Sequence, residues 1–219
     1  TSAGTFISRS FGKDQIRIGA EYSWREMVML RLGYLYEDGI WKTEDGSQSW
    51  RLVSEELPNM AASTLASSDT NPDIIYVGTG EGFDDQMIKG DGIYKSIDGG
   101  ENWTILTATS ANPVFANVLR IVVDPTDPNV LLAATRADCR LQIEDDSTTL
   151  VGYIMKSIDG GMTWKTTYSI TDDPSDTFAP TVQQVIADPT DFNILYASVR
   201  GTNILKSTDA GETWAVSFD

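Results

Sequence analysis

The sequence has no histidine and only one cysteine, Cys139. Without histidine, the chain lacks the most common general base near neutral pH and the most common ligand of transition metals. A single cysteine cannot form a disulfide within the chain, so packing and hydrogen bonds have to hold the fold together. No apolar run is long enough to form a membrane-spanning helix, and we therefore expect no transmembrane helix.

Basic residues are also scarce, and this shortage limits the expected partners. The chain has 16 Lys and Arg against 32 Asp and Glu, which gives a formal net charge of −16. Such a charge repels nucleic acids and anionic membranes, and it attracts cations or basic partners. We expect no nucleic-acid partner and no cofactor, with Ca²⁺ as the one ion that the acidic composition favours.

An internal repeat is the clearest feature that the chain does contain. The pattern Ser/Thr-x-Asp-x-Gly-x-x-Trp occurs in three exact copies, and a weaker fourth copy has Ser47 in place of Gly. In each copy we expect the Asp to accept hydrogen bonds from turn N–H groups, the Gly to supply a positive φ, and the Trp to pack between strands. These are structural roles. The motif residues are Thr43, Asp45 and Trp50; Ser96, Asp98, Gly100 and Trp103; Ser157, Asp159, Gly161 and Trp164; and Ser207, Asp209, Gly211 and Trp214.

A second repeat keeps step with the first. Residues 68–76, 124–132 and 188–196 share a polar turn that is followed by an apolar strand. Two motifs in phase, with several short strands in each unit, are typical of β-propellers. We therefore predict an all-β fold, a β-propeller made of four-stranded antiparallel blades, with four blades visible as part of a larger ring. The predicted spans are a lead-in at 1–15 without an assigned element and blades at 16–56, 60–107, 116–168 and 182–218.

The first motif resembles the Asp-box (BNR) repeat of sialidases, xyloglucan-cleaving glycosidases, sortilin-type receptors and photosystem-assembly propellers. The resemblance runs from about Ile40 to Trp214. The segments Val77-Gly-Thr-Gly-Glu81-Gly and Gly92-Ile-Tyr-Lys95 look closest to secreted bacterial sortilin-like or glycosidase-like propellers. These families share a scaffold and differ in chemistry, so the resemblance implies a secreted propeller and leaves its activity open.

Residues 16–37 allow two interpretations, each with an antiparallel hairpin. In the first, 16–22 and 27–34 are the opening strands of the first blade, and the next two strands complete the unit. In the second, 19–24 and 30–37 resemble a closing hairpin of outer-membrane barrels that accompany type IX secretion. We favour the first blade, and both interpretations indicate the outer surface of a bacterium. The chain starts at Thr1 without Met, and we expect a processed or excised piece.

Candidate site residues lie in the connections between second and third strands, which vary between the repeats. Two connections are long and acidic, 80–91 and 137–148. Their carboxylates could bind Ca²⁺, serve as the acid and base or nucleophile of a glycosidase, or remain solvated charges. Arg136 and Arg200 follow equivalent strands, but a sialidase would need a third arginine. The binding candidates are Glu81, Asp84, Asp85, Asp91, Arg136, Asp138, Glu144, Asp145, Asp146 and Arg200, and the catalytic candidates are Asp84, Asp85, Asp138 and Asp145.

These observations favour a non-catalytic propeller, extracellular or on the cell surface, that binds a protein or a polysaccharide through its variable acidic loops. The alternative is an Asp-box glycoside hydrolase, xyloglucanase-like or sialidase-like, that uses paired carboxylates. Further propeller blades or a second propeller are expected as partners in either case.

Overall fold

The computed structural model of the chain describes residues 3–9, 16–24, 28–33, 39–55, 57, 61–80, 88–137, 150–171, 181–200 and 203–218. This part of the chain contains no α-helix. Its regular elements are β-strands and one short 3₁₀-helix, η1 (Pro113–Phe115). The strands form four antiparallel sheets in which each strand pairs with its neighbours in the sequence. The predicted all-β propeller of four-stranded antiparallel blades is therefore confirmed.

The four sheets follow one another along the chain and are called blades 1 to 4. Blade 1 contains β2 (Ile16–Trp24), β3 (Val28–Gly33), β4 (Gly39–Thr43) and β5 (Arg51–Leu52). Blade 2 contains β6 (Ala62–Ser67), β7 (Ile75–Thr79), β8 (Ile93–Ser96) and β9 (Thr104–Ile105). Blade 3 contains β10 (Asn117–Val123), β11 (Leu131–Arg136), β12 (Leu150–Ser157) and β13 (Lys165–Thr171). Blade 4 contains β14 (Val182–Ala187), β15 (Leu195–Val199), β16 (Ile204–Ser207) and β17 (Ala215–Phe218).

The N-terminal region adds one strand that the sequence did not indicate. Strand β1 (Ala3–Arg9) pairs antiparallel with β2, with Ala3 opposite Tyr22, and makes the first sheet five-stranded. Residues 1–15 had no assigned element in the sequence analysis, because they lack the motifs that marked the other strands. Strand β3 is hydrogen-bonded to β4, so the hairpin of β2 and β3 is part of the sheet of blade 1.

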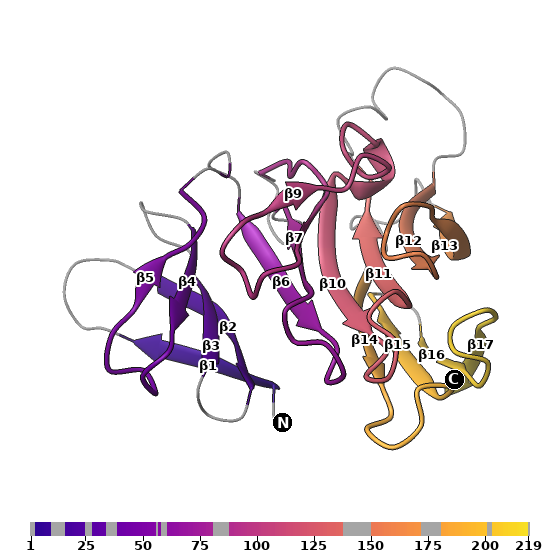
Figure 1. The fold of residues 1–219 in the computed structure, drawn as a ribbon. Coiled ribbons are helices and arrows are strands. Elements are labelled where there is room, and N and C mark those ends of the chain that lie inside the picture. The colour runs from indigo at the N-terminus through magenta and orange to yellow at the C-terminus, as the bar shows by residue number, and fades with distance from the viewer. Residues whose placement is uncertain are drawn as a thin grey trace.

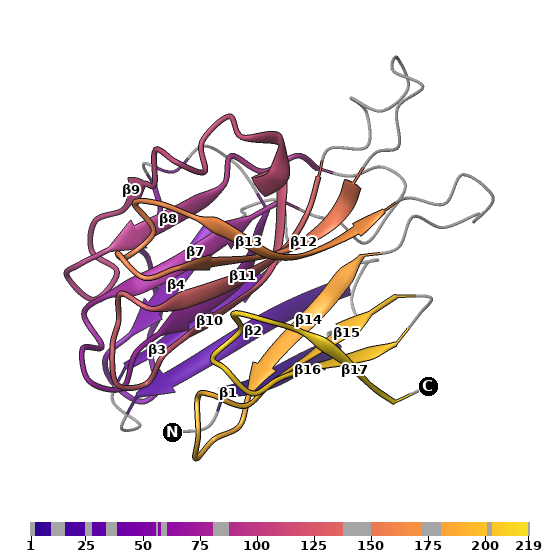
Figure 2. The same cartoon turned by 90° about the vertical axis from the view of Figure 1, so that its right-hand side faces the viewer.

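The blades pack face to face, and the first strand of each blade lies beside the first strand of the next. Strand β10 lies between β6 and β14 (Figure 1). Viewed from the side, blades 3 and 4 are two separate sheets stacked on each other (Figure 2). The alternation of side chains along a strand explains this arrangement. In β7, Ile75 and Val77 join the core between blades 1 and 2, and Tyr76 joins the core between blades 2 and 3.

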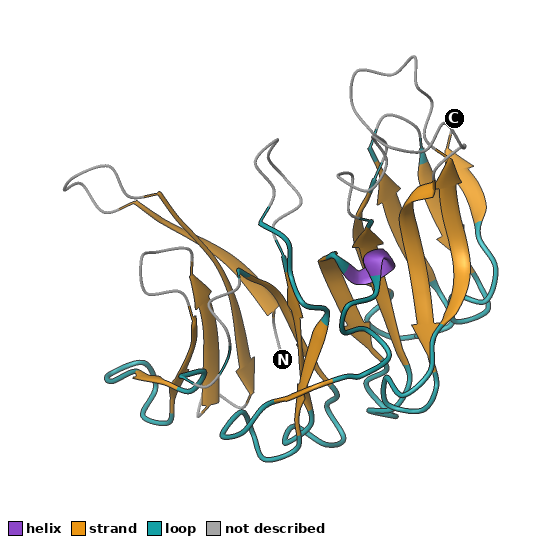
Figure 3. Ribbon diagram, turned by 90° about the horizontal axis from the view of Figure 1, so that it is seen from above, coloured by secondary structure: helices purple, strands orange, loops and turns teal. Residues whose placement is uncertain are grey.

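The connections divide between two edges of the propeller because the strands are antiparallel. Turns between third and fourth strands share one edge, called the motif edge, with turns between first and second strands (Figure 3). The motif turns, 43–50, 96–103, 157–164 and 207–214, have the same length in all four blades. The connections between second and third strands, 34–38, 80–92, 137–149 and 200–203, belong to the opposite edge, called the loop edge. They contain 5, 13, 13 and 4 residues in blades 1 to 4, so their length varies around the propeller.

Candidate functional site

The motif turns are built by a repeated set of hydrogen bonds around one carboxylate. In the turn of blade 2, Ser96 Oγ donates to Asp98 Oδ1 over 2.7 Å and accepts the N–H of Gly100 over 2.9 Å. The N–H of Asn102 donates to Asp98 Oδ1 over 2.9 Å, and its side-chain amide donates to Oδ2 over 2.7 Å. Gly100 has a φ of 86°, which favours glycine. Equivalent bonds surround Asp45, Asp159 and Asp209.

These bonds fix the charge state of the motif carboxylates. The side-chain amide of Asn102, and next its backbone N–H, lower the pKa of Asp98 from 3.8 to about 2. Asp159 has a pKa lowered to about 2 by the hydroxyl and then the N–H of Thr163. Hydrogen bonds to the ionised form stabilise it, so these groups are acceptors at neutral pH and hold no proton to donate. The motif edge therefore uses its aspartates to form turns and offers no general acid from them.

Three of the motif tryptophans, Trp103, Trp164 and Trp214, lie between blades and join them. The indole N–H of Trp103 in blade 2 donates to the carbonyl oxygen of Val53 in blade 1 over 2.9 Å. The indole of Trp214 donates to Thr167 Oγ1 of blade 3 over 3.2 Å. Trp164 packs edge-on against Phe115 with 5.2 Å between ring centroids. Their half-buried rings therefore cover the junctions between successive blades, and the apolar space that the sequence predicts for them lies between neighbouring sheets.

In blades 1 and 3, the lysine before the motif turn makes a second tie between blades. Lys42 Nζ of blade 1 lies 2.6 Å from Glu101 Oε1 of blade 2, and Arg51 pairs with the same carboxylate. Lys156 Nζ of blade 3 lies 2.8 Å from Glu212 Oε1 of blade 4. Sequence reasoning assigned these residues no role. The signal was present, because a lysine precedes all four motifs and glutamate occupies the sixth motif position in two of them.

At the loop edge, Asp91 is the one candidate carboxylate within the described residues. Its N–H donates to Thr79 Oγ1 over 2.9 Å, and its carboxylate accepts bonds from the Tyr94 hydroxyl over 3.3 Å and from Ser110 Oγ over 3.4 Å. Burial, and next the charge of Asp91, raise the pKa of Tyr94 to about 12. Asp91 therefore closes the base of the long connection in blade 2 and holds Tyr94 as a neutral donor.

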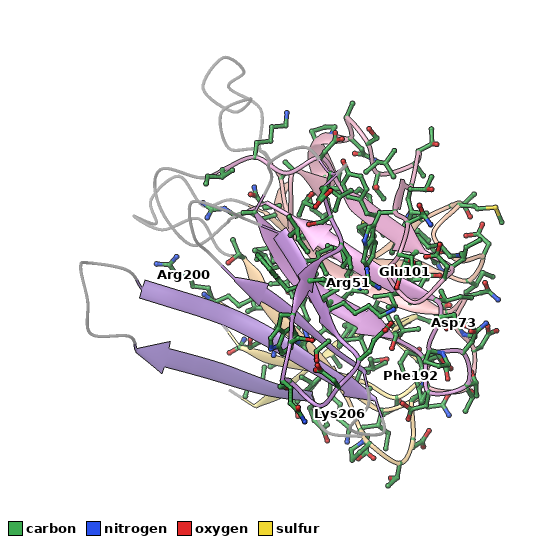
Figure 4. All side chains as sticks on the ribbon, turned by 60° about the vertical axis from the view of Figure 1, so that its left-hand side comes forward. Arg51, Asp73, Glu101, Phe192, Arg200 and Lys206 are labelled. Atoms are coloured by element: carbon green, nitrogen blue, oxygen red, sulfur yellow. The ribbon has the colours of Figure 1, made fainter. Side chains whose placement is uncertain are left out.

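Arg136 and Arg200 lie at the loop edge of adjacent blades. Arg136 is the last residue of β11, and Arg200 directly follows β15. The N–H of Arg200 donates to the carbonyl oxygen of Thr181 over 2.9 Å, as the N–H of Gly80 donates to Ala61 in blade 2 over 2.8 Å. Figure 4 shows Arg200 far from Asp73 and Phe192, which belong to turns of the motif edge. Both arginines stand at equivalent positions at the loop-edge ends of β11 and β15, as their sequence register predicts.

The other predicted site residues lie outside the described part of the chain: Glu81, Asp84, Asp85, Asp138, Glu144, Asp145 and Asp146. The proposed carboxylate pairs therefore remain predictions. Within the described residues, no group of three or more His, Cys, Asp or Glu is placed to hold a metal ion. Ca²⁺ binding by the acidic connections also remains a prediction.

Arg120 is a half-buried cation that sequence reasoning missed. It lies in β10, and burial lowers the pKa of its guanidinium. Its Nε is buried, and the described part of the chain offers it no hydrogen-bond partner. Arginine at this position interrupts an otherwise apolar strand, Val-Leu-Arg-Ile-Val-Val, and that interruption was the only signal in the sequence.

Comparison with known proteins identifies the fold. No protein-family model matches the chain, and no curated protein resembles it in sequence. The GH74 xyloglucanase from Xanthomonas campestris has a TM-score of 0.61 and 17% identity, over 87% of this chain and 28% of its own. An ancestral GH74 enzyme has a TM-score of 0.60 and 20% identity, over 85% of this chain and 22% of its own. YCF48 from Cyanidioschyzon merolae has a TM-score of 0.56 and 18% identity, over 90% of this chain and 54% of its own.

At these identities the similarity concerns the β-propeller scaffold. The chain spans about a quarter of the length of the two GH74 enzymes. Within the described residues, no helix has the length and apolar character needed to cross a membrane.

Proposed function

We propose that this chain is a propeller module that binds a protein or glycan ligand outside the cell through its loop edge. The observation that carries the proposal is the contrast between the two edges. The motif turns repeat one length and one set of hydrogen bonds, whereas the connections of the loop edge range from 4 to 13 residues and differ in sequence. A rigid scaffold with variable loops on one edge is a common arrangement for recognition.

Charge indicates the kind of ligand. The formal net charge is −16, and the two long connections of the loop edge contain all of the candidate carboxylates. Complementary potentials speed association and discriminate between partners, so a basic or neutral surface is favoured over an acidic one. Arg136, before the long connection of blade 3, and Arg200, in the short connection of blade 4, would supply local donors to a polar ligand.

The second candidate is a glycoside hydrolase. The shared scaffold with the GH74 xyloglucanase favours it, and a glycosidase needs two carboxyl groups about 5–10 Å apart and no histidine. Asp84, Asp85, Asp138 and Asp145 would be the acid and the base or nucleophile. The whole enzyme is much longer than this chain, so at most part of such a site would be present.

A binding screen with a matched variant tests the proposal. The chain is applied to an array of polysaccharides and of basic and acidic proteins, alongside a variant with Glu81, Asp84 and Asp85 changed to amides. We expect a ligand that the variant binds at least tenfold more weakly, with affinity falling as salt rises. Equal binding by both chains would contradict a role for the loop edge. Release of reducing sugar from xyloglucan, lost in Asp84→Asn or Asp85→Asn, would instead establish the hydrolase.

A further inference from the structure

Each blade has a forward face, which points toward the next blade in the sequence. The residue three places before each motif Ser or Thr is isoleucine in all four blades. Ile40, Ile93 and Ile154 have 0% exposure because blades 2, 3 and 4 cover them. Ile204 of blade 4 is 44% exposed. The forward face of blade 4 thus presents a residue that is buried in every preceding blade.

The first strand shows the same difference. Ala66 of blade 2 and Val122 of blade 3 pack against the cores that join those blades to the next ones. Ile186 holds the equivalent position in blade 4 and is 47% exposed. Two isoleucines on one face therefore leave apolar surface in water, and that surface would gain free energy from burial.

Tyr196 and Lys206 of blade 4 reproduce a pair that makes inter-blade hydrogen bonds in blade 2. Lys95 Nζ lies 5.2 Å from the ring centre of Tyr76, and Lys206 Nζ lies 5.4 Å from that of Tyr196. In blade 2, both polar ends reach blade 3. The Tyr76 hydroxyl donates to the carbonyl oxygen of Pro128 over 2.9 Å.

Lys95 Nζ makes the second inter-blade hydrogen bond of this pair. It donates to the carbonyl oxygen of Gly160, in the motif turn of blade 3, over 3.3 Å. Desolvation by the next blade lowers the pKa of Lys95, as expected for a lysine enclosed in such a junction. Blade 4 has the same tyrosine and lysine at the same register, where Tyr196 lies opposite Lys206 as Tyr76 lies opposite Lys95.

We propose that the forward face of blade 4, formed by Ile186, Tyr196, Ile204 and Lys206, is an interface for a further propeller blade of the kind represented by blade 3. The occupant has an apolar first strand that covers the two isoleucines. Its turn between first and second strands offers a main-chain carbonyl to the Tyr196 hydroxyl. Its motif turn offers a carbonyl to Lys206.

An extended chain tests this interface. A second copy of residues 106–171, which contain blade 3 and the linker before it, is appended after Phe218 of the full chain. We expect one cooperative unfolding transition at a higher Tm than that of the original chain. We also expect amide exchange around Ile204 to slow at least tenfold, because the new blade covers it. A separate transition for the added copy, with unchanged exchange at Ile204, would overturn the proposal.

Point variants separate docking from simple tethering. Lys206→Ala is expected to leave the Tm of the original chain within about 1 °C and to lower that of the extended chain by about 2–4 °C. Lys95→Ala is the matched control and should lower the Tm of both chains equally. Equal effects of Lys206→Ala in both chains would overturn the proposal.

Two further outcomes also count against the proposal. If the extended chain fails to fold, the same test is run with an appended copy of residues 172–218, and failure of both extensions overturns the proposal. Sedimentation of the original chain detects self-association. A dimer that Lys206→Ala abolishes would assign the face to a second copy of this chain and overturn the proposal as stated.

Discussion

The two edges of the propeller use aspartate in different ways. At the motif edge, Asp98 and Asp159 accept several turn hydrogen bonds each, and their pKa values fall to about 2. At the loop edge, Asp91 accepts weaker contacts of 3.3 and 3.4 Å from two side chains. The acidic composition alone therefore says little about function, because the geometry around a carboxylate decides whether it builds a turn or remains available to a ligand.

The largest loss of stability at the motif edge is expected from substitution of a motif glycine. Gly161 has a φ of 88°, and an added Cβ there would overlap Leu106, which directly follows β9 of blade 2. We expect Gly161→Ala to lower the free energy of unfolding by about 3 kcal/mol, through backbone strain and overpacking together. Gly46→Ala is the control, since its φ is 68° with no atom within 4 Å, and about 1 kcal/mol is expected. Urea denaturation measures both, and equal losses would contradict the inter-blade packing.

A slightly smaller loss is expected from the motif tryptophans. Trp164→Ala removes a ring that packs against Phe115 in the core between blades 2 and 3, and should cost about 2–3 kcal/mol. The half-buried state of the indole keeps the value below that of a fully enclosed tryptophan. Ile158→Ala in the same turn is the control, because Ile158 is 69% exposed and its loss should be within about 0.5 kcal/mol. Thermal unfolding of the two variants measures both losses, and equal losses would contradict the packing of Trp164 between the blades.

Acid should destabilise the fold through the motif carboxylates. The pKa of Asp98 is about 2 in the folded chain against an ordinary value of 3.8, so the unfolded chain binds more protons in that range. The stability that depends on these carboxylates is full above about pH 4 and is lost as the pH falls through about 2. Urea midpoints between pH 6 and 2 measure this, and Asp98→Asn should reduce the slope. A flat profile in the unsubstituted chain would show that the carboxylates do not hold the turns.

The smallest effect concerns the ion pairs between blades. Hydrogen bonds from Lys156 and next from Lys165 lower the pKa of Glu212, whose carboxylate is partly exposed. A double-mutant cycle with Lys156→Ala and Glu212→Ala should give a coupling of about 0.5–1 kcal/mol. The same cycle in 1 M salt should give less, and coupling that salt leaves unchanged would argue against a charge interaction.

The sequence was informative wherever a physical requirement repeats. Positive φ and a turn acceptor demand Gly and Asp at fixed spacing, and the all-β propeller could be predicted from that spacing. The β1 strand escaped notice because Ala-Gly-Thr-Phe-Ile-Ser-Arg has no repeat partner elsewhere in the chain. Likewise, a tryptophan in a motif shows that packing occurs and does not show against which sheet.

The candidate site was less predictable than the fold. Arg136 and Arg200 could be placed at one edge from register alone, because strand alternation fixes where each connection emerges. How far their side chains reach depends on contacts between distant residues, which spacing along the chain does not encode. Lys42, Lys95 and Lys156 illustrate the same limit, since their partners are about 50 or more residues away, in the next blade.

In this account, the motif edge stabilises the fold and the loop edge binds the ligand. Thermal unfolding and ligand capture on two variants test this difference most directly. One replaces residues 81–87 with a short Gly-Ser linker, and the other is Gly161→Ala. We predict that the linker variant keeps its Tm within about 2 °C and loses the ligand. Gly161→Ala should lose about 6–12 °C and keep the ligand below its Tm. A linker variant that unfolds early but still binds, or a Gly161→Ala chain that stays stable and cannot bind, would contradict the account.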